Sequence, residues 1–370
     1  MAWVDNDDYL TYTSTGFKFN KYTAMFDLDD TLIKTKSGAI FAKHADDWKF
    51  FNDNVPTILK HYHDNNYTII IVTNQGGLST NDKLTSWKLK ISNILANLSI
   101  PVKILVGLKT IRYRKPLPYI LTDNIDYTTL YKSKIRPIFY CGDACGRNSD
   151  HSDCDYKFAI NLDIDFVLPD IIFADVKCYK HKYNTYTPPA LSFDIRDYVA
   201  KHSTNTLNIF DKYINKPRTM IMLIGFPGCG KSYVSNYVKS RDNSYEIING
   251  DVIGSKAKQL KQLHDKLHND INVIIDNTML KLETRTEYIA IANKYNYTVI
   301  GVHIDVPIDV AFHNNTWRAI NNLHYVPTIT YNVMRKSYTA PKLSDGFTEL
   351  ITYEPSYEIT KLSHDYLFHN

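Results

Sequence analysis

The sequence predicts an α/β fold with two domains, each built on a parallel β-sheet. Three observations support this prediction: strand-length apolar runs alternate with helix-length segments, most of these runs end in polar residues, and a stretch with few such runs divides the chain. Continuous apolar runs of this length are typical of parallel strands buried on both faces. Since 370 residues suffice for two or three domains of roughly 150 each, we expect domains at 1–182 and 218–370 and a linker at 183–217.

The composition is that of a folded protein without a membrane segment. Hydrophobic residues make up 44% and charged residues 22% of the chain, which excludes a mainly disordered protein. The apolar runs are far shorter than the roughly 20 residues that cross a bilayer, and residues 3–8 are acidic where a secretory signal would be basic. We therefore expect an intracellular protein, in the nucleus and/or cytoplasm, with no membrane partner. The net charge of +4 permits contact with nucleic acid without requiring it.

Three apolar runs in the first half are followed by polar residues. The runs are 23–26, 68–72 and 137–141, and the residues that follow them are Asp27, Thr73-Asn74 and Gly142-Asp143. Ligands of parallel sheets gather at the carboxyl ends of the strands. We therefore expect these polar residues to share one site.

Asp27 and Asp29 form a candidate catalytic pair. Positions two apart in an extended segment point the same way, so the two carboxylates can face one site. Two carboxylates this close favour a cation such as Mg²⁺, which binds oxygen ligands. One can attack phosphorus while the other protonates the leaving oxygen. The alternative is an acidic turn in which Asp30-Thr31 caps a helix.

Other residues of the first half favour phosphate chemistry. Thr73 offers a hydroxyl and a backbone N–H to a phosphate, and Arg114 and Lys115 supply cations. Asp143 adds a further candidate metal ligand. A nucleophile, an acid, a hydroxyl, a lysine and an extra carboxylate together predict phosphomonoester hydrolysis.

A new strand at 219–224 opens the second half and leads into a phosphate-binding loop. Further strands are expected at 245–248, 272–275 and 297–304. Residues 225–232, Gly-Phe-Pro-Gly-Cys-Gly-Lys-Ser, fit the P-loop pattern G-x-x-x-x-G-K-[ST] at every position. Gly225, Gly228 and Gly230 would let backbone N–H groups surround the phosphates of ATP. Lys231 would reach the β- and γ-phosphates, and Ser232 would hold Mg²⁺.

Three further residues of the second half are candidates for phosphoryl transfer. Asp251 follows a strand and can act as the base that accepts a hydroxyl proton, or it can cap the helix that begins there. Asp276 ends another strand in the manner of a Walker-B aspartate. Arg318 can supply charge to the transferring group from a lid, although an arginine at such a position can also be a solvated helix residue.

The order of the motifs resembles a known family. Asp27 to Leu32 fit the signature D-x-D-x-T-[LV] of the haloacid-dehalogenase-type phosphatases, and a P-loop kinase follows them. Over residues 22–354 the chain resembles the polynucleotide kinase 3′-phosphatase family. The motifs that carry this resemblance are Ser37-Gly38, Asp47-Trp48, Thr73-Asn74-Gln75, Tyr113-Arg114-Lys115-Pro116, Gly142 to Arg147, the P-loop, Asp251 with Gly254-Ser255, Asp276-Asn277-Thr278, His313-Asn314-Asn315, Ala340-Pro341 and Gly346-Phe347.

The resemblance implies a two-domain enzyme that heals nucleic-acid ends. It would remove 3′-phosphates and phosphorylate 5′-hydroxyls of DNA, with RNA as a second candidate, so that a ligase can seal them. No N-terminal phosphopeptide-binding module is expected, because Tyr22 lies close to the N-terminus.

The resemblance also assigns roles to individual residues. Asp27 would be the phosphoaspartyl nucleophile, Asp29 the general acid/base and Asp251 the kinase base. Thr73, Arg114 and Lys115 would bind phosphate. The residues implied at ATP are Gly225, Gly228, Gly230, Lys231, Ser232 and Arg318, and those implied at Mg²⁺ are Asp27, Asp29, Asp143 and Ser232.

The chain departs from the family pattern at three places. Asp30 stands where a glycine is usual, Gly250 where arginine is common, and Thr316-Trp317 where a first lid arginine is common. The first departure adds negative charge beside the phosphatase site, and the others remove expected phosphate contacts.

Two other functions stay open at this point. One is a metabolite phosphatase fused to a small-molecule P-loop kinase, and the other is a catalytically inactive scaffold. Basic residues could line a nucleic-acid path, although such residues are often only solvated. The candidates for that path are Lys132, Lys134, Arg136, Lys177, Lys180 and Lys182.

Overall fold

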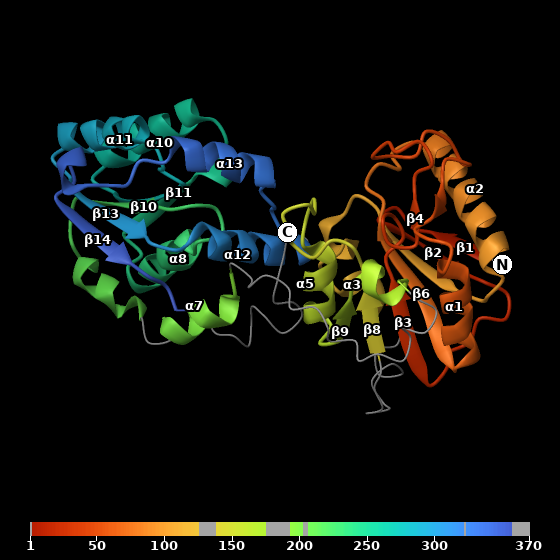
Figure 1. The fold of residues 1–370 in the computed structure, drawn as a ribbon. Coiled ribbons are helices and arrows are strands. Elements are labelled where there is room, and N and C mark those ends of the chain that lie inside the picture. The colour runs from red at the N-terminus through yellow and green to blue at the C-terminus, as the bar shows by residue number, and fades with distance from the viewer. Residues whose placement is uncertain (1, 126–137, 175–192, 203–205, 322, 357–370) are drawn as a thin grey trace. The chain divides into compact units, whose positions relative to one another are not determined.

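The computed structural model describes residues 2–125, 138–174, 193–202, 206–321 and 323–356 (Figure 1). The chain divides into two compact units, and the boundary between them falls before Phe193. Each unit is an α/β sandwich with its own sheet and its own core. In the part of the chain that is described, no helix is long and apolar enough to span a bilayer.

The first unit contains a seven-stranded sheet with the order β1-β2-β7-β6-β3-β8-β9. Its strands are β1 (Ala2–Asp5), β2 (Tyr9–Thr13), β3 (Tyr22–Phe26), β6 (Tyr67–Asn74), β7 (Lys103–Gly107), β8 (Ile138–Cys141) and β9 (Asp165–Val167). The five neighbouring strands β7, β6, β3, β8 and β9 are parallel to one another, as predicted. The β1–β2 hairpin extends this sheet in antiparallel fashion and was not anticipated. Strands β4 (Ile33–Lys34) and β5 (Lys49–Phe50) follow β3 in the chain and form a separate two-stranded antiparallel sheet.

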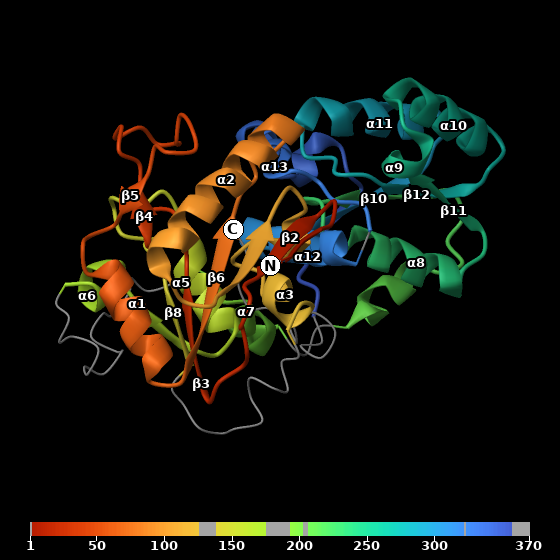
Figure 2. The same cartoon turned by 90° about the vertical axis from the view of Figure 1, so that its right-hand side faces the viewer.

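Helices cover both faces of the first sheet, as Figure 2 shows. The helices are α1 (Val55–Asp64), α2 (Asn81–Leu98), α3 (Tyr119–Thr122), α5 (Cys154–Asn161) and α6 (Pro169–Ile172), with a 3₁₀ turn η1 (Ile111–Tyr113). Alternate residues of β6 enter opposite cores: Ile69 and Ile71 pack with α1 and α2, whereas Ile70 and Val72 pack with α3 and α5. This two-sided burial explains why the strands are continuously apolar in the sequence.

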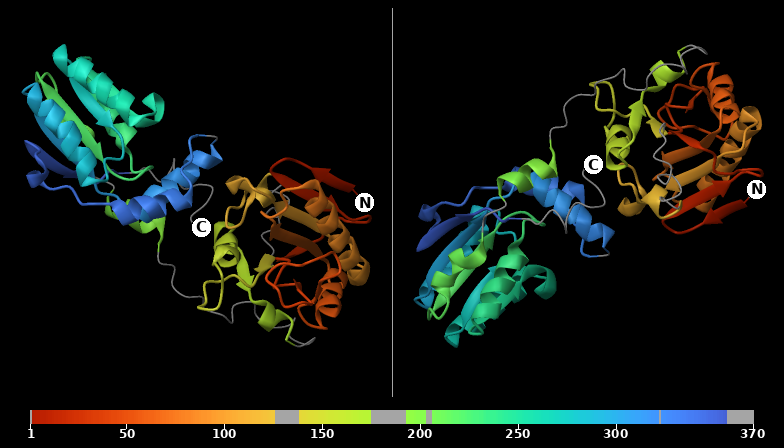
Figure 3. Two further views of the ribbon diagram at one scale, coloured as in Figure 1. Left: turned by 90° about the horizontal axis from the view of Figure 1, so that it is seen from above. Right: turned by 90° about the horizontal axis from the view of Figure 1, so that it is seen from below.

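The second unit contains a five-stranded, fully parallel sheet with the order β11-β12-β10-β13-β14. The strands are β10 (Thr219–Ile224), β11 (Tyr245–Asn249), β12 (Asn272–Asp276), β13 (Thr298–Ile304) and β14 (Glu349–Tyr353). Its helices are α7 (Ile195–Lys201), α8 (Lys231–Arg241), α9 (Gly250–Ile253), α10 (Lys256–His268), α11 (Leu282–Lys294), α12 (Ile308–Ile320) and α13 (Thr328–Ser337), with 3₁₀ turns η3 (Leu207–Tyr213) and η4 (Leu343–Asp345). Figure 3 shows this sheet between its helix layers.

The second unit begins earlier than the start at residue 218 that the sequence suggested. Of the expected linker 183–217, residues 193–202 and 206–217 are described, and they pack into the second core. Ile195 of α7 and Phe210 of η3 are fully buried there. Polar residues around Ile195 and Phe210 interrupt the apolar pattern, and for this reason the sequence predicts a linker here.

Candidate active sites

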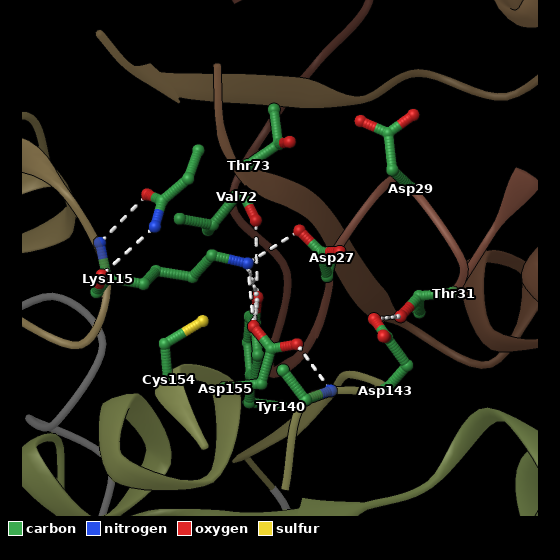
Figure 4. A network of polar contacts seen from close by, with 12 residues as sticks. Asp27, Asp29, Thr31, Val72, Thr73, Lys115, Tyr140, Asp143, Cys154 and Asp155 are labelled. Carbon is green, nitrogen blue, oxygen red and sulfur yellow. Dashed lines mark hydrogen bonds and ion pairs between the residues drawn. The ribbon is translucent and has the colours of Figure 1, made fainter. Parts of the chain in front are cut away.

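The first site lies where β3, the middle one of the five parallel strands of the first sheet, meets its neighbours β6 and β8 (Figure 4). Asp27 follows β3 directly, and its backbone N–H donates to the carbonyl of Cys141 on β8 (2.8 Å). The Asp27 side chain is 10% exposed, and its Oδ1 accepts a hydrogen bond from Lys115 Nζ (2.5 Å). The candidate nucleophile and the candidate phosphate-binding lysine are therefore in direct contact.

Lys115 is the centre of a buried polar network. Its Nζ also donates to Tyr140 Oη and to Asp155 Oδ1, both at 2.7 Å. Burial alone would lower the pKa of Lys115, but Asp155 and Asp27 together raise it above its usual value. Lys115 is therefore held as a cation beside Asp27, the candidate nucleophile.

Asp27, Asp143 and Asp155 form a carboxylate cluster that can hold a metal ion. Their oxygens lie within 4.8 Å of one another. Burial, the largest cause, raises the pKa of Asp27 well above its usual value, and raises that of Asp143 to about 6 with help from Asp155. A divalent cation with oxygen ligands would relieve this repulsion, so the donor set fits Mg²⁺. Thr31 Oγ1 donates to Asp143 Oδ1 (3.2 Å) and orients that carboxylate.

The triplet Thr73-Asn74-Gln75 at the end of β6 organises the site. The Asn74 side chain binds the Lys115 backbone twice: Oδ1 accepts from the N–H (2.9 Å), and Nδ2 donates to the carbonyl (3.0 Å). Gln75 Nε2 donates to Thr73 Oγ1 (2.9 Å) and to Asp29 Oδ2 (2.6 Å). The triplet thus connects the phosphate-binding residues to the acid/base candidate.

Asp29 lies apart from the carboxylate cluster. Figure 4 shows its carboxylate on the opposite side of Asp27 from Asp155, and the side chain is 50% exposed. In addition to Gln75, it is bound by Lys90 of α2, whose Nζ lies 3.4 Å from Asp29 Oδ1. Among the described residues, the carboxylate cluster that could hold a metal ion consists of Asp27, Asp143 and Asp155, and Asp29, which the sequence also suggested as a metal ligand, is not part of it.

Arg114 is not joined to the network of Lys115 in the described part of the chain. Its guanidinium Nη1 donates to the carbonyl of Leu108 (2.9 Å) and packs against Gly76, where a Cβ atom would collide with it.

The second site is the P-loop between β10 and α8. Gly228 and Gly230 adopt φ values of +80° and +103°, which side chains disfavour. A Cβ atom on Gly228 would also collide with the carbonyl oxygen of Ala311 on α12. Lys231 Nζ donates to the carbonyls of Gly225 (2.9 Å) and Phe226 (2.8 Å), so its ammonium lies within the loop.

Ser232 and Asp276 meet beside the P-loop. Asp276 Oδ2 accepts hydrogen bonds from Ser232 Oγ (2.9 Å), Ser235 Oγ (3.3 Å) and Asn249 Nδ2 (3.1 Å). A hydroxyl next to a strand-end carboxylate is a donor set that suits Mg²⁺. Asp276 thus lies beside Ser232, the candidate Mg²⁺ ligand of the P-loop.

Asp251 lies in the first turn of α9 and is exposed. It does not cap this helix. Asn249 does so, because its Oδ1 accepts from the backbone N–H groups of Asp251 (2.9 Å) and Val252 (3.1 Å). His324 lies 3.9 Å from the Asp251 carboxylate. Since its side chain is not used for capping, Asp251 is available to a substrate.

Helices α12 and α13, which we call the lid helices, are hydrogen-bonded to the P-loop. Asn314 Nδ2 donates to the carbonyl of Gly228 (2.9 Å), and Tyr331 Oη donates to that of Pro227 (2.5 Å). Asn315 exchanges hydrogen bonds with the backbone of Val326 (2.8 and 2.9 Å), which ties the segment after α12 to that helix. Arg318 lies half-buried on α12, close enough to Tyr331 to affect its pKa.

Comparison with known proteins assigns the family. The family model "Polynucleotide kinase 3 phosphatase" matches residues 22–173, and the model "AAA domain" matches residues 255–341. The bifunctional polynucleotide phosphatase/kinase of Schizosaccharomyces pombe is 31% identical over 362 residues, which cover 95% of this chain and 84% of that protein. The chain belongs to the bifunctional polynucleotide phosphatase/kinase family. The resemblance inferred from the motif order is thereby confirmed.

Two further relatives show how this family covers the chain. A protein of Acanthamoeba polyphaga mimivirus with the same bifunctional designation is 31% identical over 399 residues, covering 95% of this chain and 90% of that protein. The polynucleotide 3′-phosphatase of Saccharomyces cerevisiae is 29% identical over 212 residues and covers 40% of this chain and 85% of that protein. The two bifunctional relatives thus match 95% of the chain, and the 3′-phosphatase matches 40% of it.

Sequence reasoning missed three residues of the first site: Tyr140, Asp155 and Lys90. Asp155 lies on the buried face of α5 with Phe158 and Ala159, and Lys90 lies on the buried face of α2. The sequence feature that could have revealed Asp155 and Lys90 is a charged residue at a helix position where the amphipathic pattern calls for an apolar one. Tyr140 carried no such signal, because a tyrosine in a buried strand is ordinary.

Proposed function

We propose that this chain heals nucleic-acid ends by removing 3′-phosphates and by phosphorylating 5′-hydroxyls with ATP. The observation that carries this proposal is 31% identity to a bifunctional relative over 95% of the chain, and it is supported by the carboxylate and lysine network in the first unit and the P-loop in the second. We place the phosphatase in the first unit and the kinase in the second, with cores close to the expected domains 1–182 and 218–370.

In the phosphatase, Asp27 attacks the phosphorus and the 3′-oxygen leaves. Lys115 neutralises the phosphoryl oxygens, while Asp155 and Tyr140 hold the ammonium in place. Asp29 donates a proton to the leaving oxygen and later takes one from the water that hydrolyses the aspartyl phosphate. Asp27, Asp143 and Asp155 would hold Mg²⁺, which supplies electrostatic stabilisation of the phosphoryl charge.

In the kinase, Lys231 and the P-loop backbone bind the phosphates of ATP. Ser232 and Asp276 would hold Mg²⁺, which neutralises charge on the phosphates. Asp251 accepts the proton of the 5′-hydroxyl, and Arg318 on the lid stabilises the transferring group. Gly250, where arginine is common in the family, leaves room for Asn277, since a Cβ at Gly250 would lie 2.9 Å from the Asn277 side chain.

The substrate is an end of DNA, with RNA as a second candidate, and a ligase acts on the product. The basic residues suggested for the nucleic-acid path, Lys132, Lys134, Arg136, Lys177, Lys180 and Lys182, lie outside the described residues.

An end-healing assay tests this function. Matched DNA and RNA oligonucleotides with a 5′-hydroxyl and a 3′-phosphate are incubated with the full chain, Mg²⁺ and ATP, and both ends are followed. We expect loss of the 3′-phosphate with or without ATP, and 5′-phosphorylation only with ATP. Turnover confined to free sugar phosphates and nucleosides would instead support a metabolite phosphatase fused to a small-molecule kinase. No turnover of any phosphoester would support an inactive scaffold.

A further inference from the structure

Lys90 is a buried lysine whose ammonium points at the acid/base candidate. It lies on α2 and is 6% exposed, between Trp87 and Ile94 on the face that packs into the core. Its Nζ donates to Asp29 Oδ1 (3.4 Å), the one hydrogen-bond and ion-pair partner that it has among the described residues. A leucine or methionine is the usual occupant of such a core position.

The contact between Lys90 and Asp29 is a poor stabiliser of the fold. Burying an ammonium group costs free energy that one long hydrogen bond to a half-exposed carboxylate does not recover. Replacing a buried ion by a hydrophobic residue of similar volume is often neutral or stabilising. The presence of Lys90 at this position is therefore better explained by its effect on Asp29 than by packing.

Asp29 is held at both of its oxygens. Lys90 binds Oδ1 from α2, and Gln75 binds Oδ2 from the end of β6 (2.6 Å). Figure 4 shows this carboxylate across Asp27 from Asp155, away from the carboxylate cluster. An exposed aspartate without such partners would sample several rotamers, whereas two donors from different elements restrict it.

We propose that Lys90 is a positioning residue for Asp29 in the phosphatase reaction. The inference rests on the proposed role of Asp29 as proton donor to the leaving 3′-oxygen. The polar side-chain partner of Lys90 in the described part of the chain is Asp29 and not the candidate nucleophile Asp27. Lys90 fixes the acid on the leaving-group side of Asp27 while the metal-binding carboxylates occupy the other side.

The test compares Lys90→Met with Lys88→Met in the full chain. Lys88 lies on the same helix and pairs with Asp5 (2.7 Å), so Lys88→Met removes a lysine from α2 without touching Asp29. We expect Lys90→Met to lower kcat/KM roughly 10-fold for a 3′-phosphorylated oligonucleotide, a smaller loss than the 10²–10⁴-fold of full acid catalysis. Its Tm and its 5′-kinase activity should match those of Lys88→Met, which should behave as wild type.

Two further measurements separate positioning from a structural role. With an aryl phosphate, whose leaving group needs no proton, kcat/KM of Lys90→Met should stay at the wild-type value, since this parameter reports the attack by Asp27. In an Asp29→Ala background, Lys90→Met should cause no further loss. Equal losses on both substrates, a lowered Tm or full additivity with Asp29→Ala would overturn the inference, as would wild-type activity of Lys90→Met. If Asp29→Ala alone kept normal activity on the oligonucleotide, the proposed role of Asp29 would be wrong instead.

Discussion

Lys115 is the central residue of the candidate phosphatase site, because its three ammonium N–H groups bind Asp27, Asp155 and Tyr140 at the same time. In the proposed reaction Asp27 attacks phosphorus, so another residue has to hold this lysine in place. Asp155 can, since its Oδ1 binds Lys115, its Oδ2 accepts from the N–H of Ala144 (3.1 Å), and Gly142 leaves it space. A Cβ atom on Gly142 would lie 2.5 Å from this carboxylate, which explains glycine before Asp143.

Asp155→Asn should therefore impair the phosphatase specifically. The amide keeps the shape but removes the charge that helps to hold Lys115 as a cation, so we expect kcat/KM for 3′-phosphate removal to fall on the order of 10²-fold. Kinase activity should be unchanged, because Asp155 belongs to the first unit. Asp153→Asn is the matched control, since Asp153 precedes the same helix and pairs with Lys157 instead. Equal effects of the two substitutions would contradict the role of Asp155.

The raised pKa values of Asp27 and Asp143 predict how stability depends on pH. An unfolded aspartate has a pKa near 3.9, whereas folding raises that of Asp143 to about 6, mainly through burial. The folded state thus binds protons more tightly, and stability without metal is lost as the pH rises from about 4 through 6. Mg²⁺ should replace these protons.

Thermal unfolding of the full chain at several pH values checks this expectation. In excess chelator, the Tm of the first unit should fall between about pH 4 and pH 7, and Mg²⁺ should raise it more at pH 7.5 than at pH 5. Asp143→Asn should reduce both effects. A Mg²⁺ effect of equal size at both pH values would show that the cluster does not exchange protons for metal.

At the scale of single elements, the turn after β3 accommodates an unusual residue. Asp30 occupies a position where glycine is usual in the family, and it adopts φ = +54°. Aspartate tolerates the left-handed region better than most residues, whereas alanine does not. Asp30→Ala should therefore lower stability by about 1 kcal/mol, or about 2–4 °C in Tm, while Asp30→Gly should be tolerated. A similar Tm for both variants would show that this backbone conformation carries no strain.

The elements that the sequence predicted best are the buried parallel strands, because burial on both faces leaves a continuous apolar run. Strands β3, β6 and β10 all begin and end within two residues of the expected limits. The β1–β2 hairpin was missed because β2, Tyr-Leu-Thr-Tyr-Thr, mixes polar and aromatic residues and so lacks the continuous apolar run of the parallel strands. Position relative to the strands also predicted two candidate site residues: Thr73 lies next to Asn74, the last residue of strand β6, and Asp143 follows the end of β8.

Some candidate site residues can be predicted from a short sequence motif, whereas others reach the site only through the packing of distant segments. Asp27, Lys231 and Ser232 belong to short motifs whose spacing alone places them at a strand end or a helix start. Asp155 and Lys90 reach the site from helices distant in sequence, and only the packing of those helices brings them there. Arg114 belongs to a motif, yet its side chain turns to Leu108, which the motif could not reveal.

At the scale of the whole molecule, each unit has its own core and holds its candidate site within that core. The network of Lys115 uses residues of the first unit alone, and the P-loop, Asp276 and the lid helices belong to the second. We therefore expect the two reactions to be separable by single substitutions.

Two inactivating substitutions test this separation. Asp27→Asn removes the nucleophile, so 3′-phosphate removal should fall to background while 5′-phosphorylation persists. Lys231→Ala removes a charge from the β/γ-phosphates, so 5′-transfer should fall on the order of 10²-fold or more while 3′-phosphate removal persists. An equimolar mixture of the two variants should then convert a 5′-hydroxyl, 3′-phosphate break into ligatable ends, at about half the rate of the same total amount of wild type. Each variant alone should leave one end unhealed, which serves as the control. If the mixture failed although each variant kept its remaining activity on single ends, the two reactions would need to occur on one chain without release of the substrate, and independent action of the two units would be excluded.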